Sequence, residues 1–174
     1  MSELTTLHDA ITRIISEHMP RVVHVEQYPE LGAEVMTPAL LYGITDMSPG
    51  LDRGAGKTAV IGRFQSCILV EAARPKASLQ AAILAGQMMT VLKDQLWDVD
   101  FVTGPPEQVH AQPEAPTLDL EQFVMWSVQW VQPFELGDLN WPWEDEPPGS
   151  LVFGFSPDIG PGSEQQYVAP EDIE

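Results

Sequence analysis

Charge is distributed very unevenly along this chain, and this limits how much of it can fold into one core. All 8 lysine and arginine residues lie at or before Lys93, whereas 16 of the 26 acidic residues follow Trp97. Of the 16 prolines, 11 also follow Asp98. An acidic, proline-rich segment has too little apolar surface to offset the entropy lost on ordering, so it need not fold alone. We therefore expect a folded domain over residues 1–136 and an extended acidic arm over residues 137–174.

The net charge also excludes several classes of partner. At −18, the chain lacks the basic surface that gives proteins their affinity for nucleic acid, and anionic membranes would repel it. The longest uncharged run, residues 77–92, is too short and too rich in serine and glutamine to span a bilayer. No cationic stretch followed by an apolar core is visible near the first residue, so we expect synthesis in the cytoplasm without a secretory signal.

Apolar periodicity predicts two helices and several strands. The first helix carries an apolar stripe from Leu4 to Met19 and ends before Pro20. The second is expected to begin at a Ser78 cap and to bury Ala81, Leu84, Ala85, Met88, Met89, Leu92 and Leu96. The order of elements predicts an α+β fold, an antiparallel or mixed sheet with two helices packed on one face. The expected helices span residues 4–19 and 78–97, and the expected strands span residues 21–28, 39–46, 59–73 and 123–134.

Alternation within the longest strands predicts which face is buried. Residues alternate in polarity along 59–73 and again along 123–134, as expected of strands with one face against the core. A hairpin partner near residues 108–112 and a short extra strand at 151–155 complete the expected set. The predicted core-facing residues are Phe64, Ser66, Ile68 and Val70 on the first strand, and Val124, Trp126, Val128 and Trp130 on the second.

The segment Gly54-Ala55-Gly56-Lys57-Thr58 resembles the end of a phosphate-binding loop. The full motif needs a glycine at position 51, where this chain has leucine, and it must lead into a helix that presents its amides to the phosphate. The residues after Thr58 read as a strand instead. We therefore expect no ATP binding, and interpret the segment as a basic loop whose glycines allow positive φ at its tip.

Residues able to bind metals or to catalyse reactions are sparse. The single cysteine, Cys67, rules out an internal disulfide, and its apolar neighbours favour a small buried side chain. The histidines lack the spacing of a helical zinc pair, and no Gly-x-Ser-x-Gly elbow is present. Most carboxylates lie among prolines and polar residues, without the apolar surroundings that raise a catalytic pKa. We expect no enzyme activity, metal or cofactor; the histidines are His8, His18, His24 and His110.

Several aromatic and basic residues are candidates for contacts between molecules. Trp141, Trp143, Phe153 and Phe155 lie in the acidic arm, where local structure offers them little to pack against. We expect them to anchor the arm on the chain's own sheet or on a neighbouring copy. Arg53 and Lys57 lie in the long loop of residues 46–57 and are expected to meet acidic groups on a neighbour.

The order of these elements resembles the tail terminator proteins of long-tailed bacteriophages and Mu-like prophages. The resemblance covers residues 1–136: a short first helix ending His18-Met19-Pro20, a strand with Val22, Val23 and Val25, and a glycine-rich charged loop. Next come a strand that leads into the second helix and, later in the chain, a strand that carries Trp126 and Trp130. The resemblance implies a subunit of a hexameric ring that caps the head-proximal end of the tail tube in the virion, stops polymerisation and joins the head.

The partners implied are other copies of the chain, the tail tube protein and a head-completion or connector protein, with DNA passing through unbound. Another neck or tail-completion protein remains open, as does a cellular adaptor whose acidic arm mimics nucleic acid. If the ring conducts DNA, acidic walls would repel the duplex, although acids on an outer surface would equally keep a subunit soluble. The candidate channel-facing acids are Asp98, Asp100, Glu107, Glu114, Asp119, Glu121, Glu135 and Asp138.

Overall fold

The computed structural model describes residues 2–27, 35–52, 54, 56–116 and 120–137, and the following concerns these residues. The chain divides after Asn140 into two units, of which the first contains all of them. The helices are α1 (Glu3–His18) and α2 (Ala77–Leu92). The strands are β1 (His24–Gln27), β2 (Ala39–Pro49), β3 (Thr58–Glu71), β4 (Glu107–Glu114) and β5 (Phe123–Leu136).

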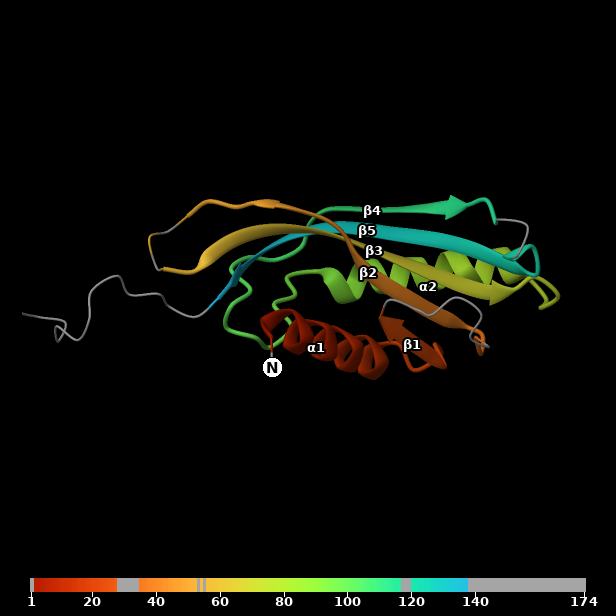
Figure 1. The fold of residues 1–174 in the computed structure, drawn as a ribbon. Helices are drawn as coiled ribbons and strands as arrows, with labels where there is room; N and C mark the ends of the chain where they lie inside the picture. The colour runs from red at the N-terminus through yellow and green to blue at the C-terminus, as the bar shows by residue number, and fades with distance from the viewer. Residues whose placement is uncertain (1, 28–34, 53, 55, 117–119, 138–174) are drawn as a thin grey trace, which may run out of the picture. The chain divides into compact units, whose positions relative to one another are not determined.

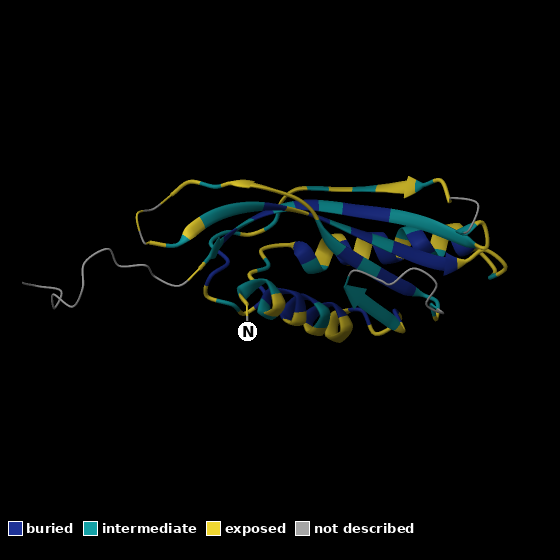
Figure 2. Cartoon of the chain, viewed as in Figure 1, coloured by how far each residue is buried: buried dark blue, intermediate teal, exposed yellow. Residues whose placement is uncertain are grey.

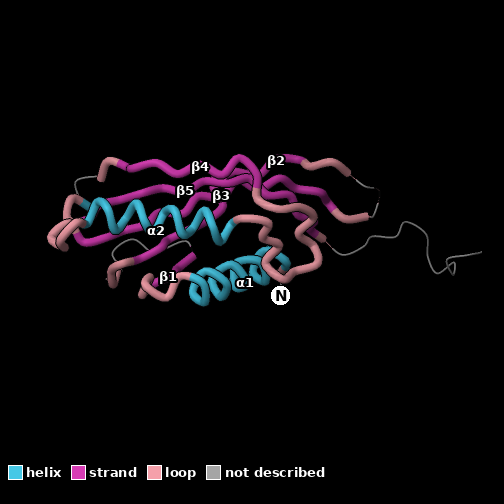
Figure 3. The backbone as a smooth tube through the Cα atoms, turned by 180° about the vertical axis from the view of Figure 1, so that it is seen from behind, coloured by secondary structure: helices cyan, strands magenta, loops and turns pink. Residues whose placement is uncertain are grey.

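The strands form one mixed five-stranded sheet in the order β1-β2-β3-β5-β4 (Figure 1). β1 pairs with β2 in parallel, and the other neighbouring strands are antiparallel. Both helices lie on the same face of the sheet, as the view from behind also shows (Figure 3). The predicted α+β fold, with two helices packed on one face of a mixed sheet, is therefore confirmed.

The core lies between this face and the helices (Figure 2). Phe64, Ile68 and Val70 of β3 are fully buried, and the Phe64 ring stacks on Trp130 of β5 with centroids 5.1 Å apart. Ser66 is also buried and donates a hydrogen bond to the Val128 carbonyl. The predicted alternation of β3 is thus confirmed. The predicted face of β5 packs on the core as well, with Val128 and Trp130 fully buried and Val124 and Trp126 half-buried.

The prediction for α2 was wrong at both ends. Its N-cap is Lys76, in a left-handed conformation, and Ser78 lies inside the helix without capping it. Its last residue is Leu92 because Lys93 turns to an extended conformation and Asp94 adopts a φ of 56°. Of the predicted stripe, Met89 and Leu96 are exposed, and the other members are buried.

The remaining differences lie mostly at strand ends. β1 begins only at His24, and the β2–β3 hairpin is longer than predicted, since β2 continues to Pro49 and β3 begins at Thr58. The predicted hairpin partner near residues 108–112 is present as β4. β5 extends two residues beyond the predicted end, to Leu136. The strand expected at residues 151–155 lies outside the described residues.

Candidate interaction surfaces

The β2–β3 hairpin is the first candidate surface. Its distal part extends past both helices (Figures 1 and 3), where the pairing continues to Pro49 opposite Val60. From Thr45 onward every residue of β2 is exposed, because the helices no longer cover it. Met47 is 52% exposed and Leu51, in the turn, is 84% exposed. The hairpin therefore carries apolar side chains away from the core, where they gain nothing from burial in the isolated subunit.

The turn of this hairpin has the conformation predicted for a glycine-rich tip. Gly54 and Gly56 have φ values of 71° and 72°, which favour glycine. The Gly54 amide donates to Oδ1 of Asp52 across 2.8 Å. A strand follows at Thr58, so the segment leads into no helix that could present amides to a phosphate. Lys57 is half-buried here, whereas Arg53 lies outside the described residues.

The sheet face turned away from the helices is the second candidate surface. Gln65 and Cys67 of β3 lie opposite Gln129 and Ser127 of β5, and β4 continues the row with His110 and Gln112. These side chains are polar and largely uncharged. The Gln129 side-chain amide donates to Oε1 of Gln65 across 3.5 Å. This face therefore offers a partner hydrogen-bonding groups rather than an apolar surface.

Glu114 is a carboxylate on this polar face. Ser127 and Gln112 donate to its Oε1 across 2.6 and 3.1 Å, and these bonds lower the pKa of Glu114. The expectation that Cys67 is buried was only partly right, since it is half-buried on this face rather than in the core. Desolvation, together with the nearby Glu114 charge, raises the pKa of the Cys67 thiol to about 11. The thiol is therefore protonated and unreactive at neutral pH.

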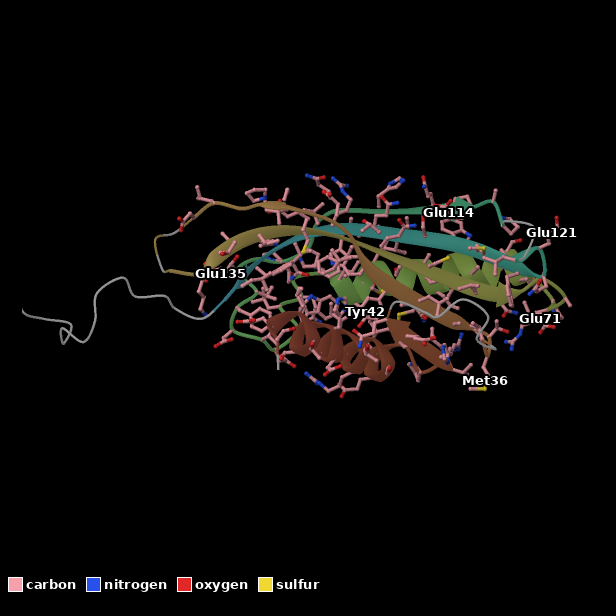
Figure 4. The ribbon with its side chains drawn as sticks, viewed as in Figure 1. Met36, Tyr42, Glu71, Glu114, Glu121 and Glu135 are labelled. Atoms are coloured by element: carbon pink, nitrogen blue, oxygen red, sulfur yellow. The ribbon has the colours of Figure 1, made fainter. Side chains whose placement is uncertain are left out.

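Three of the acids proposed to face a channel, Glu107, Glu114 and Glu135, lie on the sheet face turned away from the helices, but they are spread along it. Glu121 and Glu135 lie toward opposite ends of β5 (Figure 4), and Glu107 and Glu114 lie on the edge strand β4. Asp98 accepts a hydrogen bond from Nη2 of Arg13 across 3.0 Å. Asp100 is exposed in the segment between α2 and β4. Asp119, Asp138 and the arm residues Trp141, Trp143, Phe153 and Phe155 lie outside the described residues.

The histidines of the described residues lie apart from one another. His8 is buried in α1, and its ring lies 5.6 Å from that of Tyr42. His24 pairs with Glu26 across 2.9 Å, and His18 bonds the Ile14 carbonyl. Within the described residues, no group of three or more histidine, cysteine or acidic side chains is placed to hold a metal ion. No helix among them is long and apolar enough to cross a membrane.

The outer face of α2 is a surface that the sequence reasoning missed. Leu79 is 55% exposed, Ile83 46% and Met89 39%, and Gly86 is exposed between them. None of the 16 residues of this helix is charged. The sequence predicts a single apolar stripe that includes Met89, but Leu79 and Ile83 lie outside that stripe. Apolar residues on a second side of the helix were the signal that could have indicated this surface.

The fold has a structural likeness to known proteins, but no protein-family model matches the chain and no curated protein matches its sequence. Among solved structures, the chain is similar to the sheath/tube terminator of an extracellular contractile injection system, PVC, determined in its extended state. The TM-score is 0.39 and the sequence identity 14%, over 91% of this chain. The chain spans 64% of the length of that protein.

Proposed function

We propose that this protein is a structural subunit of a bacteriophage-like tail, and specifically a tail terminator. In this role, copies of the chain form a ring, with six subunits as the resemblance implies, on the head-proximal end of the tail tube. The ring stops tube polymerisation and presents a surface to a head-completion or connector protein. The subunit acts by assembly, so the proposal assigns it neither a reaction nor a cofactor.

The observation that carries this proposal is the β2–β3 hairpin that extends beyond the helices. Exposed apolar residues such as Met47 and Leu51 contribute to stability only when another surface covers them. A two-stranded ribbon projecting from a sheet is poorly suited to enclosing a small molecule, but it can reach a neighbouring subunit. The order of helices and strands from α1 to β5 is also the order from which we inferred the resemblance to tail terminators.

The charges suggest how assembly is limited to the proper place. With a net charge of −18, free subunits repel one another, so we expect them to be largely monomeric in solution. Lys57, together with Arg53, would meet acidic groups on a neighbour or on the tail tube. Such contacts weaken as salt screens them, over about 8 Å at physiological ionic strength. The tube end therefore supplies the template on which the ring closes.

The role of the acidic residues remains part of the proposal. Because Glu121 and Glu135 lie toward opposite ends of β5, they cannot both lie at the same height of a channel parallel to that strand. Glu107 and Glu114 are the first and last residues of the edge strand β4, so they too lie at different heights along the sheet. We propose that acids of this kind repel passing DNA without binding it.

The arm over residues 137–174 is proposed to dock in the assembled particle through Trp141, Trp143, Phe153 and Phe155. Each fully buried aromatic side chain would contribute about 1.5–3 kcal/mol. Limited proteolysis should remove the arm from free subunits and spare it in assembled particles. Equal protection in both states would argue against docking on a neighbour.

Electron microscopy of the purified protein mixed with tail tubes tests the proposal. We expect rings at one end of each tube and a stop to tube growth when the protein is added. A variant with Met47→Ser and Leu51→Ser should lose this activity, while the exposed-site variant Ser16→Ala on α1 should keep it. Binding along the tube wall, or no binding to tubes at all, would contradict the terminator role.

A further inference from the structure

We propose that the outer face of α2 receives the tip of the β2–β3 hairpin of a second copy, in a head-to-tail contact. The α2 face is defined here as Leu79, Ala82, Ile83, Gly86 and Met89, and the hairpin tip as Met47 and Leu51 with Lys57. This inference rests on the proposed function, because it names the surfaces through which the ring would close.

A comparison of the two helices shows that the α2 face is unusual for a solvent-facing surface. α1 and α2 each have 16 residues and pack on the same side of the sheet. The exposed side of α1 carries Asp9, Arg13 and Glu17, as expected of a helix facing water. The exposed side of α2 carries no charge: Leu79, Ile83 and Met89 are apolar there, and the exposed polar residues, Ser78, Gln87 and Thr90, are neutral. Three large apolar side chains gathered on one uncharged helix side favour contact with another molecule.

The α2 face leaves room for a side chain of another molecule. A methyl group placed on Gly86 would meet no atom within 4 Å, so the backbone lies open at this point. Gly86 and the small Ala82 lie one turn apart, between Leu79 and Ile83 on one side and Met89 on the other. Met47 or Leu51 of another copy could therefore pack on the backbone at Gly86 and contact these apolar side chains.

The charges of the two surfaces favour a second copy as the occupant. The α2 face carries no charged side chain. The hairpin around its tip carries Asp46 and Asp52 beside Arg53 and Lys57, so its formal charges cancel. Two chains of net charge −18 must meet where acids do not add repulsion, and these two surfaces meet that condition.

The geometry of a single copy makes this contact head-to-tail. The hairpin extends along the sheet past the helices, whereas the α2 face points away from the sheet, so the two surfaces do not meet within one molecule (Figures 1 and 3). A contact between two different surfaces repeats from copy to copy, and it closes into a ring when the rotation permits. A 16-residue helix is about 24 Å long, so one such contact is smaller than the roughly 800 Å² per partner of a stable pair. Closure of the ring, in which every copy makes two contacts, compensates for this.

Disulfide trapping tests the contact in the purified full-length chain. In a Cys67→Ser background, Leu51→Cys combined with Ile83→Cys should give, on mild oxidation of a concentrated sample, a ladder of covalent oligomers. Leu51→Cys combined with Ser16→Cys, on the exposed side of α1, is the matched control and should give no ladder. A ladder of equal strength in the control would overturn the proposal, as would the absence of a ladder from the first pair.

Two further results separate this inference from its alternatives. Ile83→Cys alone should remain monomeric on oxidation; efficient dimers would mean that two α2 faces meet each other, which contradicts the head-to-tail contact. At the high protein concentration used for trapping, where the weak contact is populated, Ile83→Glu should weaken self-association at least tenfold in sedimentation velocity, while Ser16→Glu leaves it unchanged and both variants keep the parent melting temperature. Because these measurements need no tails, they can fail while the terminator role stands, and they can succeed in a protein that caps no tube.

Discussion

The indole Nε1 of Trp97 donates a hydrogen bond to Oε1 of Gln132 across 2.7 Å, and both side chains are buried. Nε2 of Gln132 donates in turn to the carbonyls of Gln95 and Gly104 across 2.9 and 3.0 Å. One glutamine of β5 thus fixes both ends of the segment that follows α2. The arrangement explains how Trp97 holds a φ of 60°, since its side chain is anchored in the core.

Replacing Gln132 should destabilise the protein strongly. Gln132→Leu leaves the Trp97 N–H and two carbonyl groups without their partner in a buried site, which should cost about 2–4 kcal/mol. Gln129→Leu, on the half-buried opposite face of the same strand, is the control and should cost much less. Urea unfolding followed by tryptophan fluorescence measures both. Equal losses would mean that the bonds to Gln132 contribute no more than ordinary packing.

Gly62 should tolerate no side chain. A methyl group added at this position would lie 2.6 Å from Cε1 of Phe134 and 3.0 Å from Cε2 of Phe64, both in the core. Gly62→Ala should therefore lower the free energy of unfolding by about 1–3 kcal/mol. Gly86→Ala, in the open face of α2, should instead raise it by about 0.5–1 kcal/mol. The prediction fails if the two alanine variants shift the melting temperature in the same direction.

His8 should make stability depend on pH. Burial lowers the pKa of His8 below its ordinary value near 6.5, although the neighbouring Asp9 charge offsets part of the effect. Below that value the unfolded chain binds a proton that the folded chain does not, so the free energy of unfolding should fall as the pH drops from 7.5 through 6.5. His8→Leu should flatten this slope. Thermal melts of both proteins across this range provide the measurement, and parallel slopes would contradict the assignment.

Cys67 should react slowly in the folded protein. Its pKa of about 11, against an ordinary value of 9.0, leaves roughly a hundredfold less thiolate at pH 8. Reaction with a disulfide reagent should therefore speed up by about that factor when urea unfolds the chain. Because the folded state favours the protonated thiol, stability should also fall as the pH rises from 9 toward 11, and Cys67→Ser should abolish that loss. A folded protein that reacts as fast as the unfolded chain would refute the assignment.

Alternation and helical periodicity predicted the fold because they report on the faces that bury most surface. Phe64, Ile68 and Trp130 lie in the core as expected, since each follows the period of its strand. The end of α2 could not be predicted, because Trp97 leaves the helix for a hydrogen bond to a residue 35 positions away. Gln132 continues the core face of β5 from Trp130, but a polar residue at that position did not indicate its three hydrogen-bond partners, Gln95, Trp97 and Gly104.

The candidate surfaces were harder to predict than the core. The hairpin loop around Lys57 was identified, but the sequence did not show that β2 and β3 pair so far beyond the helices. Met89 was assigned to the core, because the period of α2 admits two apolar stripes and only the packing decides between them. The topology and register of the sheet decide which acidic residues share a surface. The order of the acidic residues between Glu107 and Glu135 in the sequence did not indicate this arrangement.

The length of tails assembled without this protein decides whether it is a tail terminator. The gene would be deleted from the genome that encodes it, and the lengths of the tails would be measured by electron microscopy. Supplying the gene again from a plasmid is the control. A terminator stops polymerisation, so we predict tails of irregular and mostly excessive length without attached heads, returning to uniform length on restoration. Tails of normal, uniform length in the deletion strain would contradict the account.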